Sequence, residues 1–155
     1  MSYIYRKIIF PDFDGLLNTE HYQGLLRYQG EPWQDEHGAF FDPNAVKQLR
    51  RIIDATDADI VIESSWKYLG LDAMKELWKV RNLPGRVIDI TPSSVSDEYL
   101  LKNLDTTMLH CKGMEIASWL SEQAEDIRYA IIDDDNPYEG ITEEQTNRAI
   151  SILNG

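Results

Sequence analysis

Apolar residues follow two alternating patterns along the chain. Short β-prone runs predict strands over about 3–11, 59–63, 86–90 and 129–132. Between them, apolar residues at helical spacing predict helices over 71–81, 113–122 and 143–153, and one that begins at Pro43. Strands that alternate with helices are typical of an α/β fold, in which helices flank a parallel sheet with right-handed crossovers.

Local signals mark where two of these helices begin. Asp42 suits the N-cap position and Pro43 suits the first helical position. Thr142 and Gln145 have the spacing of a capping box ahead of the last helix. Three tryptophans are predicted to lie in the core: Trp66, Trp78 and Trp119.

Two segments show no clear pattern. Residues 19–41 are polar and contain several glycines, and we expect a small flap there rather than a large cap domain. The aromatic residues of this flap either contact a substrate or form a hydrophobic lid, and the sequence favours neither: Tyr22, Tyr28, Trp33, Phe40 and Phe41. Residues 93–111 are ambiguous, with a helix predicted near 97–104.

Length and composition narrow the picture. The 155 residues, 43% of them hydrophobic, fit a single domain over 1–155 with a sizeable core. No apolar run approaches the roughly 20 residues that cross a bilayer, and Cys111 has no second cysteine to pair with, so we expect a cytoplasmic protein. The net charge of −12 argues against a broad surface for duplex nucleic acid, but a small phosphorylated group stays compatible with it. The oligomeric state is not indicated.

Two carboxylates follow the first predicted strand at an interval of two residues. Asp12 and Asp14 leave the strand on the same side, and Gly15 allows the backbone to turn sharply after them. Like charges at this distance repel unless a cation or a proton lies between them. The pair therefore indicates a magnesium site, or a nucleophile beside an acid/base.

Other polar residues follow the later strands. Ser64 and Ser65 come after the second strand, and Asp133 and Asp134 come after the fourth. Ligands of parallel α/β sheets bind beyond the carboxyl ends of the strands, where these residues are expected to meet Asp12. The convergence is a stronger signal than any one motif, because Asp-x-Asp-Gly alone is often only a turn.

Together these residues have the chemistry that phosphoryl transfer requires. Asp12 can attack phosphorus to form an aspartyl-phosphate, and Asp14 can protonate the leaving oxygen and later deprotonate water. Carboxylates such as Asp12 and an acid from 133–134, with the carbonyl of Asp14, suit Mg²⁺. A hydroxyl from Ser64 or Ser65 and a cation, for which Lys112 is suitably placed, complete the contacts to phosphate.

Three sequence blocks carry a family resemblance. They are Asp12 to Asn18 (DFDGLLN), Ser64 to Lys67 (SSWK) and Lys112 to Leu120 (KGMEIASWL). With the later acids, they resemble the haloacid dehalogenase (HAD) superfamily, and more narrowly the HAD-like domain of Swiss Army Knife RNA-repair proteins. The resemblance implies a Rossmann-like core and a Mg²⁺-dependent phosphatase. It also implies site residues in these positions: nucleophile Asp12, acid/base Asp14, Ser64, Lys112 and the metal-binding Asp133 and Asp134.

Some features depart from that pattern. Pro11 removes a backbone donor beside the predicted nucleophile, and Glu63 places a carboxylate in an otherwise apolar strand. The short segment after residue 135 indicates that a fifth strand is missing. Two alternatives to a general phosphomonoesterase therefore stay open: a phosphatase that heals polynucleotide ends, and a catalytically impaired HAD-like binding module.

Overall fold

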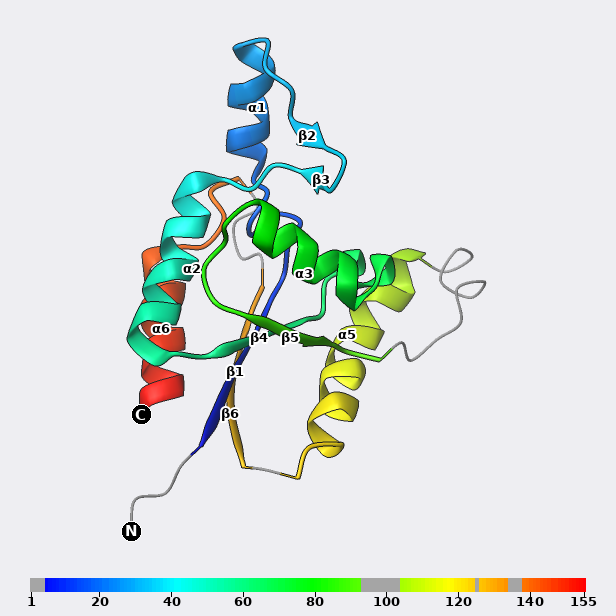
Figure 1. Cartoon of the computed structure of the whole chain (residues 1–155), viewed down its shortest axis with the longest axis vertical. Helices are drawn as coiled ribbons and strands as arrows, with labels where there is room; N and C mark the ends of the chain where they lie inside the picture. The colour runs from blue at the N-terminus through cyan, green and yellow to red at the C-terminus, as the bar shows by residue number, and fades with distance from the viewer. Residues whose placement is uncertain (1–4, 93–103, 125, 134–137) are drawn as a thin grey trace.

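Four parallel strands form the central sheet, in the order β5-β4-β1-β6. Their bounds are Arg6–Pro11 for β1, Asp59–Ile62 for β4, Val87–Ile90 for β5 and Ile127–Ile132 for β6. This computed structural model describes residues 5–92, 104–124, 126–133 and 138–155, with 104–112 described as helical backbone. All four predicted strands are confirmed, and so is the parallel α/β fold (Figure 1).

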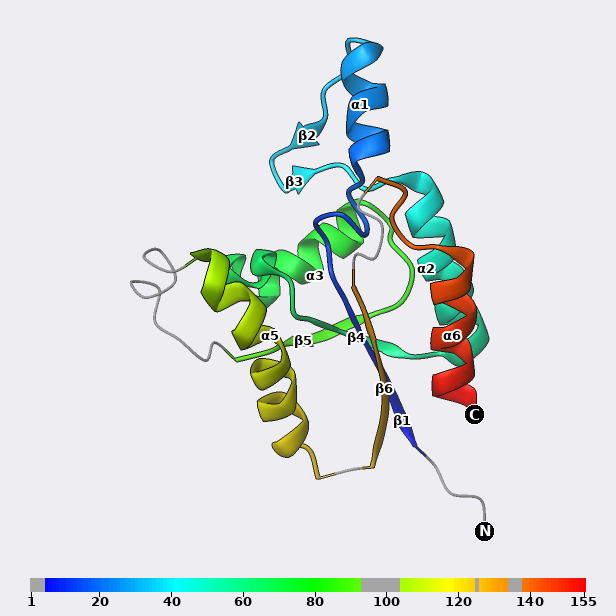
Figure 2. The same cartoon turned by 180° about the vertical axis from the view of Figure 1, so that it is seen from behind.

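Helices cover both faces of the sheet, and α5 lies opposite α2 and α6 in both views (Figures 1 and 2). The bounds are Pro43–Thr56 for α2, Leu71–Val80 for α3, Leu104–Ser121 for α5 and Glu143–Asn154 for α6. One face packs with α2, α3 and α6 around residues such as Ile9, Ile60 and Leu49. The other packs with α5 around Ile8, Phe10, Val61, Ile116 and Trp119.

The alternation of these two clusters along β1 follows from strand geometry. Ile8 and Phe10 belong to the α5 side, and Ile9 belongs to the opposite side. Residues of even number at the end of β1 therefore leave the sheet toward α5. This parity determines on which side Asp12 emerges.

Helix termini agree with the sequence signals except in α5. Asp42 caps α2 through a hydrogen bond from the Asn44 N–H, and Thr142 and Gln145 form the predicted capping box of α6. The predicted start of a helix at Gly113 is wrong, because α5 already begins at Leu104. Of the helix predicted over 97–104, residues 97–103 lie outside the described part of the chain.

Residues 19–41 form an insertion above the carboxyl edge of the sheet (Figure 1). It contains α1, Glu20–Tyr28, which the sequence pattern did not predict, and the two short antiparallel strands β2, Gln34–Asp35, and β3, Gly38–Ala39. Its two ends meet: the Thr19 hydroxyl, which caps α1, donates a 2.6 Å hydrogen bond to Asp42 Oδ2. We call residues 19–41 the insertion and β2–β3 its hairpin.

The described residues after β6 form no further strand. In the described ranges the next element after β6 is α6, and residues 134–137 lie outside them. No helix of the described residues is long and apolar enough to cross a membrane.

Candidate active site

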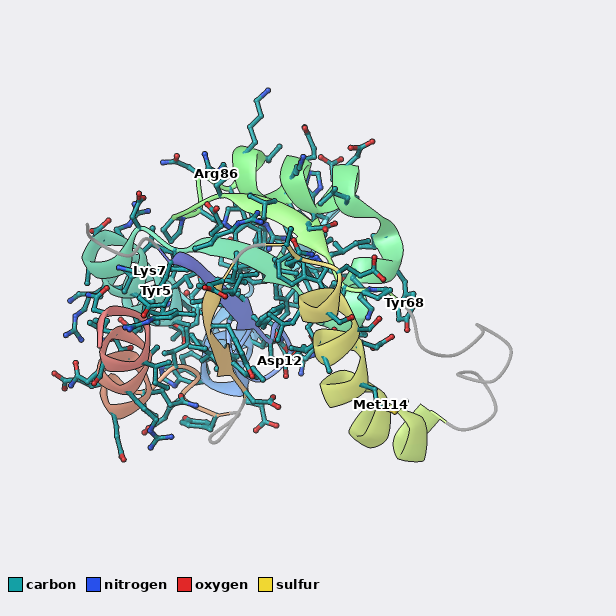
Figure 3. The ribbon with its side chains drawn as sticks, turned by 90° about the horizontal axis from the view of Figure 1, so that it is seen from below. Tyr5, Lys7, Asp12, Tyr68, Arg86 and Met114 are labelled. Atoms are coloured by element: carbon teal, nitrogen blue, oxygen red, sulfur yellow. The ribbon has the colours of Figure 1, made fainter. Side chains whose placement is uncertain are left out.

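The first predicted site residue, Asp12, stands directly after β1. Its N–H donates to the carbonyl of Ile132 at 2.9 Å, and its Oδ1 accepts from the N–H of Phe13 at 2.8 Å. The residue is half-buried and lies between the ribbon of the sheet and α5 (Figure 3). The carboxylate is thus held by its own backbone at the carboxyl edge of a central strand.

A tight turn follows and presents Asp14 to solvent. The carbonyl of Phe13 accepts from the N–H groups of Leu16, Leu17 and Asn18, and Gly15 has a φ of 82°. A positive φ is easiest for glycine, so its place in this turn has a backbone reason. The Asp14 side chain is exposed to solvent.

Two neutral donors orient the Asp14 carboxylate. The side-chain amide of Asn18 donates to Oδ1 at 2.8 Å, and the indole Nε1 of Trp66 donates to the same oxygen at 3.1 Å. Trp66 was predicted as a core residue, but it is only half-buried because this edge of the ring reaches the site. Trp78 and Trp119 are buried as predicted, with 5% and 4% of their surfaces exposed.

The end of β6 brings a second acid beside Asp12. Pro11 is in register with Ile132, so Asp133 follows its strand at the level where Asp12 follows β1. The Gln145 amide of the α6 capping box donates to the carbonyl of Asp133 at 2.8 Å, which fixes this loop to α6. Sequence reasoning assigned Gln145 only a capping role. Asp134 lies outside the described residues.

A close approach ties the same loop to the turn after β1. A Cβ on Gly140 would lie 2.5 Å from the carbonyl oxygen of Leu16 and 2.6 Å from Cγ2 of Thr19. The φ of 80° also favours glycine at this position. Gly140 therefore lets the segment before α6 lie directly against the turn that carries Asp14.

The donor types at these strand ends fit Mg²⁺. Asp12 and Asp133 offer carboxylate oxygens from neighbouring strand ends, and Asp14 offers a backbone carbonyl. No group of three or more acidic, histidine or cysteine ligands is found within the ranges described. Mg²⁺ does not need such a cage, because it binds proteins through one or two carboxylates and keeps several waters.

Ser64 and Ser65 follow β4 at the same edge of the sheet. Ser65 begins the short 3₁₀ helix η1, Ser65–Leu69, and Ser64 is its N-cap, whose Oγ accepts from the N–H of Trp66 at 3.2 Å. Only 1% of Ser64 is exposed, whereas Ser65 is half-buried. Ser64 thus has a capping role, which leaves its hydroxyl hydrogen available to donate.

Lys112 lies inside α5, not ahead of the helix. Only its backbone belongs to the described part of the chain, so its predicted contact with phosphate stays a prediction. The sequence prediction of a helix start at Gly113 was wrong because a single glycine can be accommodated in a helix interior.

A buried cluster next to the site was missed by sequence reasoning. Lys67 Nζ lies 2.9 Å from Glu115 Oε1 and 3.5 Å from Glu63 Oε2. It also donates to the Thr91 hydroxyl at 2.9 Å, and that hydroxyl donates to Glu63. We call these four residues the acid–lysine cluster. Each is at most 5% exposed.

This cluster accounts for the carboxylate of Glu63, which follows β4 and is not part of the strand, contrary to the prediction. Glu63 does not add an unpaired charge to the site, because Lys67 and Thr91 contact it. Burial, with a contribution from the neighbouring Glu115 carboxylate, raises the pKa of Glu63 from 4.5 to about 7, and the Thr91 hydroxyl and Lys67 oppose the rise. One signal was visible in the sequence: Lys67 follows Glu63 by four residues.

Pro11 also has a place in the ladder. Asp12 directs its N–H toward β6, so the nitrogen of Pro11 faces β4. The pairing of β1 with β4 comprises Ile8 and Ile9 and ends before Pro11. Pro11 therefore removes no hydrogen bond from the ladder between β1 and β6.

The aromatic residues of the insertion divide between lid and surface. Phe41 is buried in the main core, and Phe40 lies under the guanidinium of Arg81 at 5.4 Å. Tyr28 is 91% exposed, and Trp33 packs against Arg27 at 5.4 Å. Phe41 thus belongs to the core, and the choice between substrate contact and a lid for the other aromatic residues stays a prediction.

A parallel sheet with Asp12 and Asp14 after its first strand, and an acid after the neighbouring strand, defines a Rossmann-like HAD domain. Residues 8–151 match the family described as the HAD domain in Swiss Army Knife RNA repair proteins, and the chain belongs to this family. Comparison with curated proteins and with solved structures gives no match. The family supports a HAD-like phosphatase or RNA-repair role.

Proposed function

We propose that the protein is a Mg²⁺-dependent phosphomonoester hydrolase that acts through an aspartyl-phosphate on Asp12. The hydrogen bond from the Asp12 N–H to the carbonyl of Ile132 is the observation that most supports this reading. It joins the ends of β1 and β6, and Asp12 and Asp133 follow these two strands at the same level. Membership of a HAD family adds independent support.

In the first step an oxygen of Asp12 attacks phosphorus, and the bond between phosphorus and the ester oxygen breaks. Asp14 gives its proton to that oxygen, so that the product leaves as a neutral alcohol. In the second step water attacks the phosphorus and Asp14 accepts a proton from it. The bond between phosphorus and Asp12 breaks, which releases phosphate and restores the carboxylate.

Charge on the phosphoryl oxygens has to be balanced in both steps. When bound, Mg²⁺ supplies positive charge there, and Asp12, Asp133, Asp134 and the Asp14 carbonyl are the groups proposed to hold it. The hydroxyls of Ser64 and Ser65 and the ammonium group of Lys112 are proposed to contact the phosphate. Ser65 is the more exposed of the two serines.

The substrate is proposed to be a phosphorylated end on a larger molecule or a small phosphoester. The description of the family as part of RNA repair proteins favours a polynucleotide end as the second candidate. The net charge of −12 limits such binding to the terminal nucleotides, because a broad acidic surface repels the phosphate backbone. We propose the cytoplasm as the place of action.

Phosphate release separates these possibilities. We expect wild-type protein with Mg²⁺ to release phosphate from p-nitrophenyl phosphate, and removal of the metal with EDTA to stop it. Asp12→Asn should lower kcat by at least about 10³-fold, because no other group can form the covalent intermediate. Oligonucleotides with a 3′- or a 5′-phosphate, assayed side by side, test the end-healing candidate.

Asp54→Asn is the matched control, because Asp54 is an exposed residue of α2 and the change has the same chemistry. It should leave turnover unchanged. Activity that survives Asp12→Asn would refute the nucleophile. An inactive wild type that still binds Mg²⁺ would favour the binding module.

A further inference from the structure

A line of contacts leads from the insertion to the carboxylate of Asp14, and Trp66 is its central residue. The indole N–H of Trp66 and the amide of Asn18 both donate to Oδ1 of Asp14, at 3.1 and 2.8 Å. Two donors at one oxygen stabilise negative charge there and fix the plane of the carboxylate. The other oxygen, Oδ2, is then the one that carries the proton in exchange with a substrate.

The ring of Trp66 is itself held by packing. It meets Phe13 edge-on, with ring centroids 5.1 Å apart, and lies 5.8 Å from the ring of Phe41. The backbone of Gly38, in the hairpin of the insertion, lies against it: a Cβ there would be 2.7 Å from Cη2 and 2.8 Å from Cζ3 of the indole. Any residue larger than glycine has to displace the ring.

Arg81, at the end of α3, holds the hairpin in this position. Its guanidinium donates to the carbonyl of Ala39 at 2.9 Å, and to the carbonyl of Gly38 and the carboxylate of Asp35 at 2.8 Å. It also lies 5.1 Å from the ring centroid of Phe41. The seat of Trp66 is therefore built by residues of the core, with the hairpin fastened onto it.

We infer that Trp66 is a positioning residue for Asp14, and that the hairpin of the insertion sets the orientation of its indole. Trp66 acts on the reaction through Asp14 and not through the phosphate. The inference rests on the proposed function, in which Asp14 protonates the leaving group. A misplaced Asp14 therefore slows hydrolysis most for substrates whose leaving group most needs that proton.

Leaving-group dependence measures this effect. Trp66→Phe keeps an aromatic ring but removes the N–H donor. We expect its kcat/KM to fall at least about tenfold more for an alkyl phosphate, glycerol phosphate, than for p-nitrophenyl phosphate, whose leaving group needs little protonation. Gly38→Ala displaces the ring without removing it. Its kcat/KM should also fall more for glycerol phosphate than for p-nitrophenyl phosphate.

Trp78→Phe is the matched control. The Trp78 indole belongs to the same core but donates to the carbonyl of Pro84, at 2.9 Å. Loss of this N–H donor should lower kcat/KM for both substrates by the same factor, or leave both unchanged. If Trp66→Phe lowers kcat/KM by the same factor for both substrates, the inference is overturned.

A second measurement is independent of turnover. In ¹H–¹⁵N spectra, the indole signal of Trp66, assigned through Trp66→Phe, should shift in Asp14→Ala and in Gly38→Ala but not in Asp72→Ala, an exposed change on α3. If the Trp66 signal does not shift in Asp14→Ala, the inference is overturned, whether or not the protein is active. A wild type without turnover whose signal does shift overturns the proposed function, while the coupling between hairpin and Asp14 stands.

Discussion

Two groups of charged residues lie at the carboxyl edge of the sheet, and they differ in their exposure to solvent. Asp12 is half-buried and accepts a hydrogen bond from a backbone N–H of the turn. Asp14 is exposed and accepts from the neutral side chains of Asn18 and Trp66. The acid–lysine cluster is buried, with ionic partners for its charges. Buried charge is tolerated only when it is paired and hydrogen-bonded, whereas reactive charge has to reach solvent. We therefore expect stability to depend on the cluster and chemistry to depend on the aspartates.

Lys67→Met should have the largest effect on stability. It removes the cation and leaves the carboxylates of Glu63 and Glu115 facing each other in a buried site. Loss of one partner of a buried ion pair costs about 3–5 kcal/mol of unfolding free energy. Urea unfolding at neutral pH measures it, with Lys67→Arg, which keeps the charge, as the control. A loss below about 1 kcal/mol would contradict the role assigned to the cluster.

Glu63→Gln should alter the dependence of stability on pH. The pKa of Glu63 is raised from 4.5 to about 7 by burial, so between these values the folded state binds more protons than the unfolded state. The contribution of this group to the unfolding free energy then falls as pH rises from 4.5 to 7. The fall is on the order of 3 kcal/mol.

The variant should lack this fall. Its unfolding free energy, measured in urea at pH 5 and at pH 7.5, should decrease less between the two values than that of the wild type. Glu144→Gln, an exposed change on α6, is the control and should follow the wild type. Parallel pH profiles for Glu63→Gln and the wild type would show that Glu63 does not titrate in this range.

Asp14→Asn should have the smallest effect on stability. Asn keeps an oxygen that can accept from Trp66 and Asn18, and the site is exposed, so the unfolding free energy should change by less than about 0.5 kcal/mol. Hydrolysis of glycerol phosphate should nevertheless fall by at least about 10²-fold, because the proton donor is gone. A large change in stability would place Asp14 with the buried cluster instead.

The sequence predicted the elements whose signals are local and strong. Asp42 with Pro43, and Thr142 with Gln145, mark helix starts that the structure confirms. The helix α1 was missed because the polar residues and glycines of the segment, Gly24 among them, indicated a loop, and only Leu26 of its residues is buried. The available signals were the N-cap Thr19, Glu20 in the first turn and Gly30 just after the helix.

The candidate site was predictable in part for the same reason. Asp12, Asp14 and Asp133 follow strands that the pattern identifies, and parallel strands bring their ends together. The contact between Lys67 and Glu115 joins residues far apart in the chain, and the indole N–H of Trp66 reaches Asp14 across 52 positions. Neither contact has a spacing that a single sequence reveals.

The hydrogen bond between Thr19 and Asp42 makes the insertion a closed loop whose two ends already touch. Its length is therefore nearly decoupled from the stability of the sheet: for a flexible loop, doubling the number of residues costs only about 0.6 kcal/mol in closure entropy. A longer segment, or a small folded domain, could replace α1 while the capped ends keep the entry and exit directions. This pair of residues marks the place where the fold can exchange α1 for another segment, provided that the hairpin against Trp66 is kept.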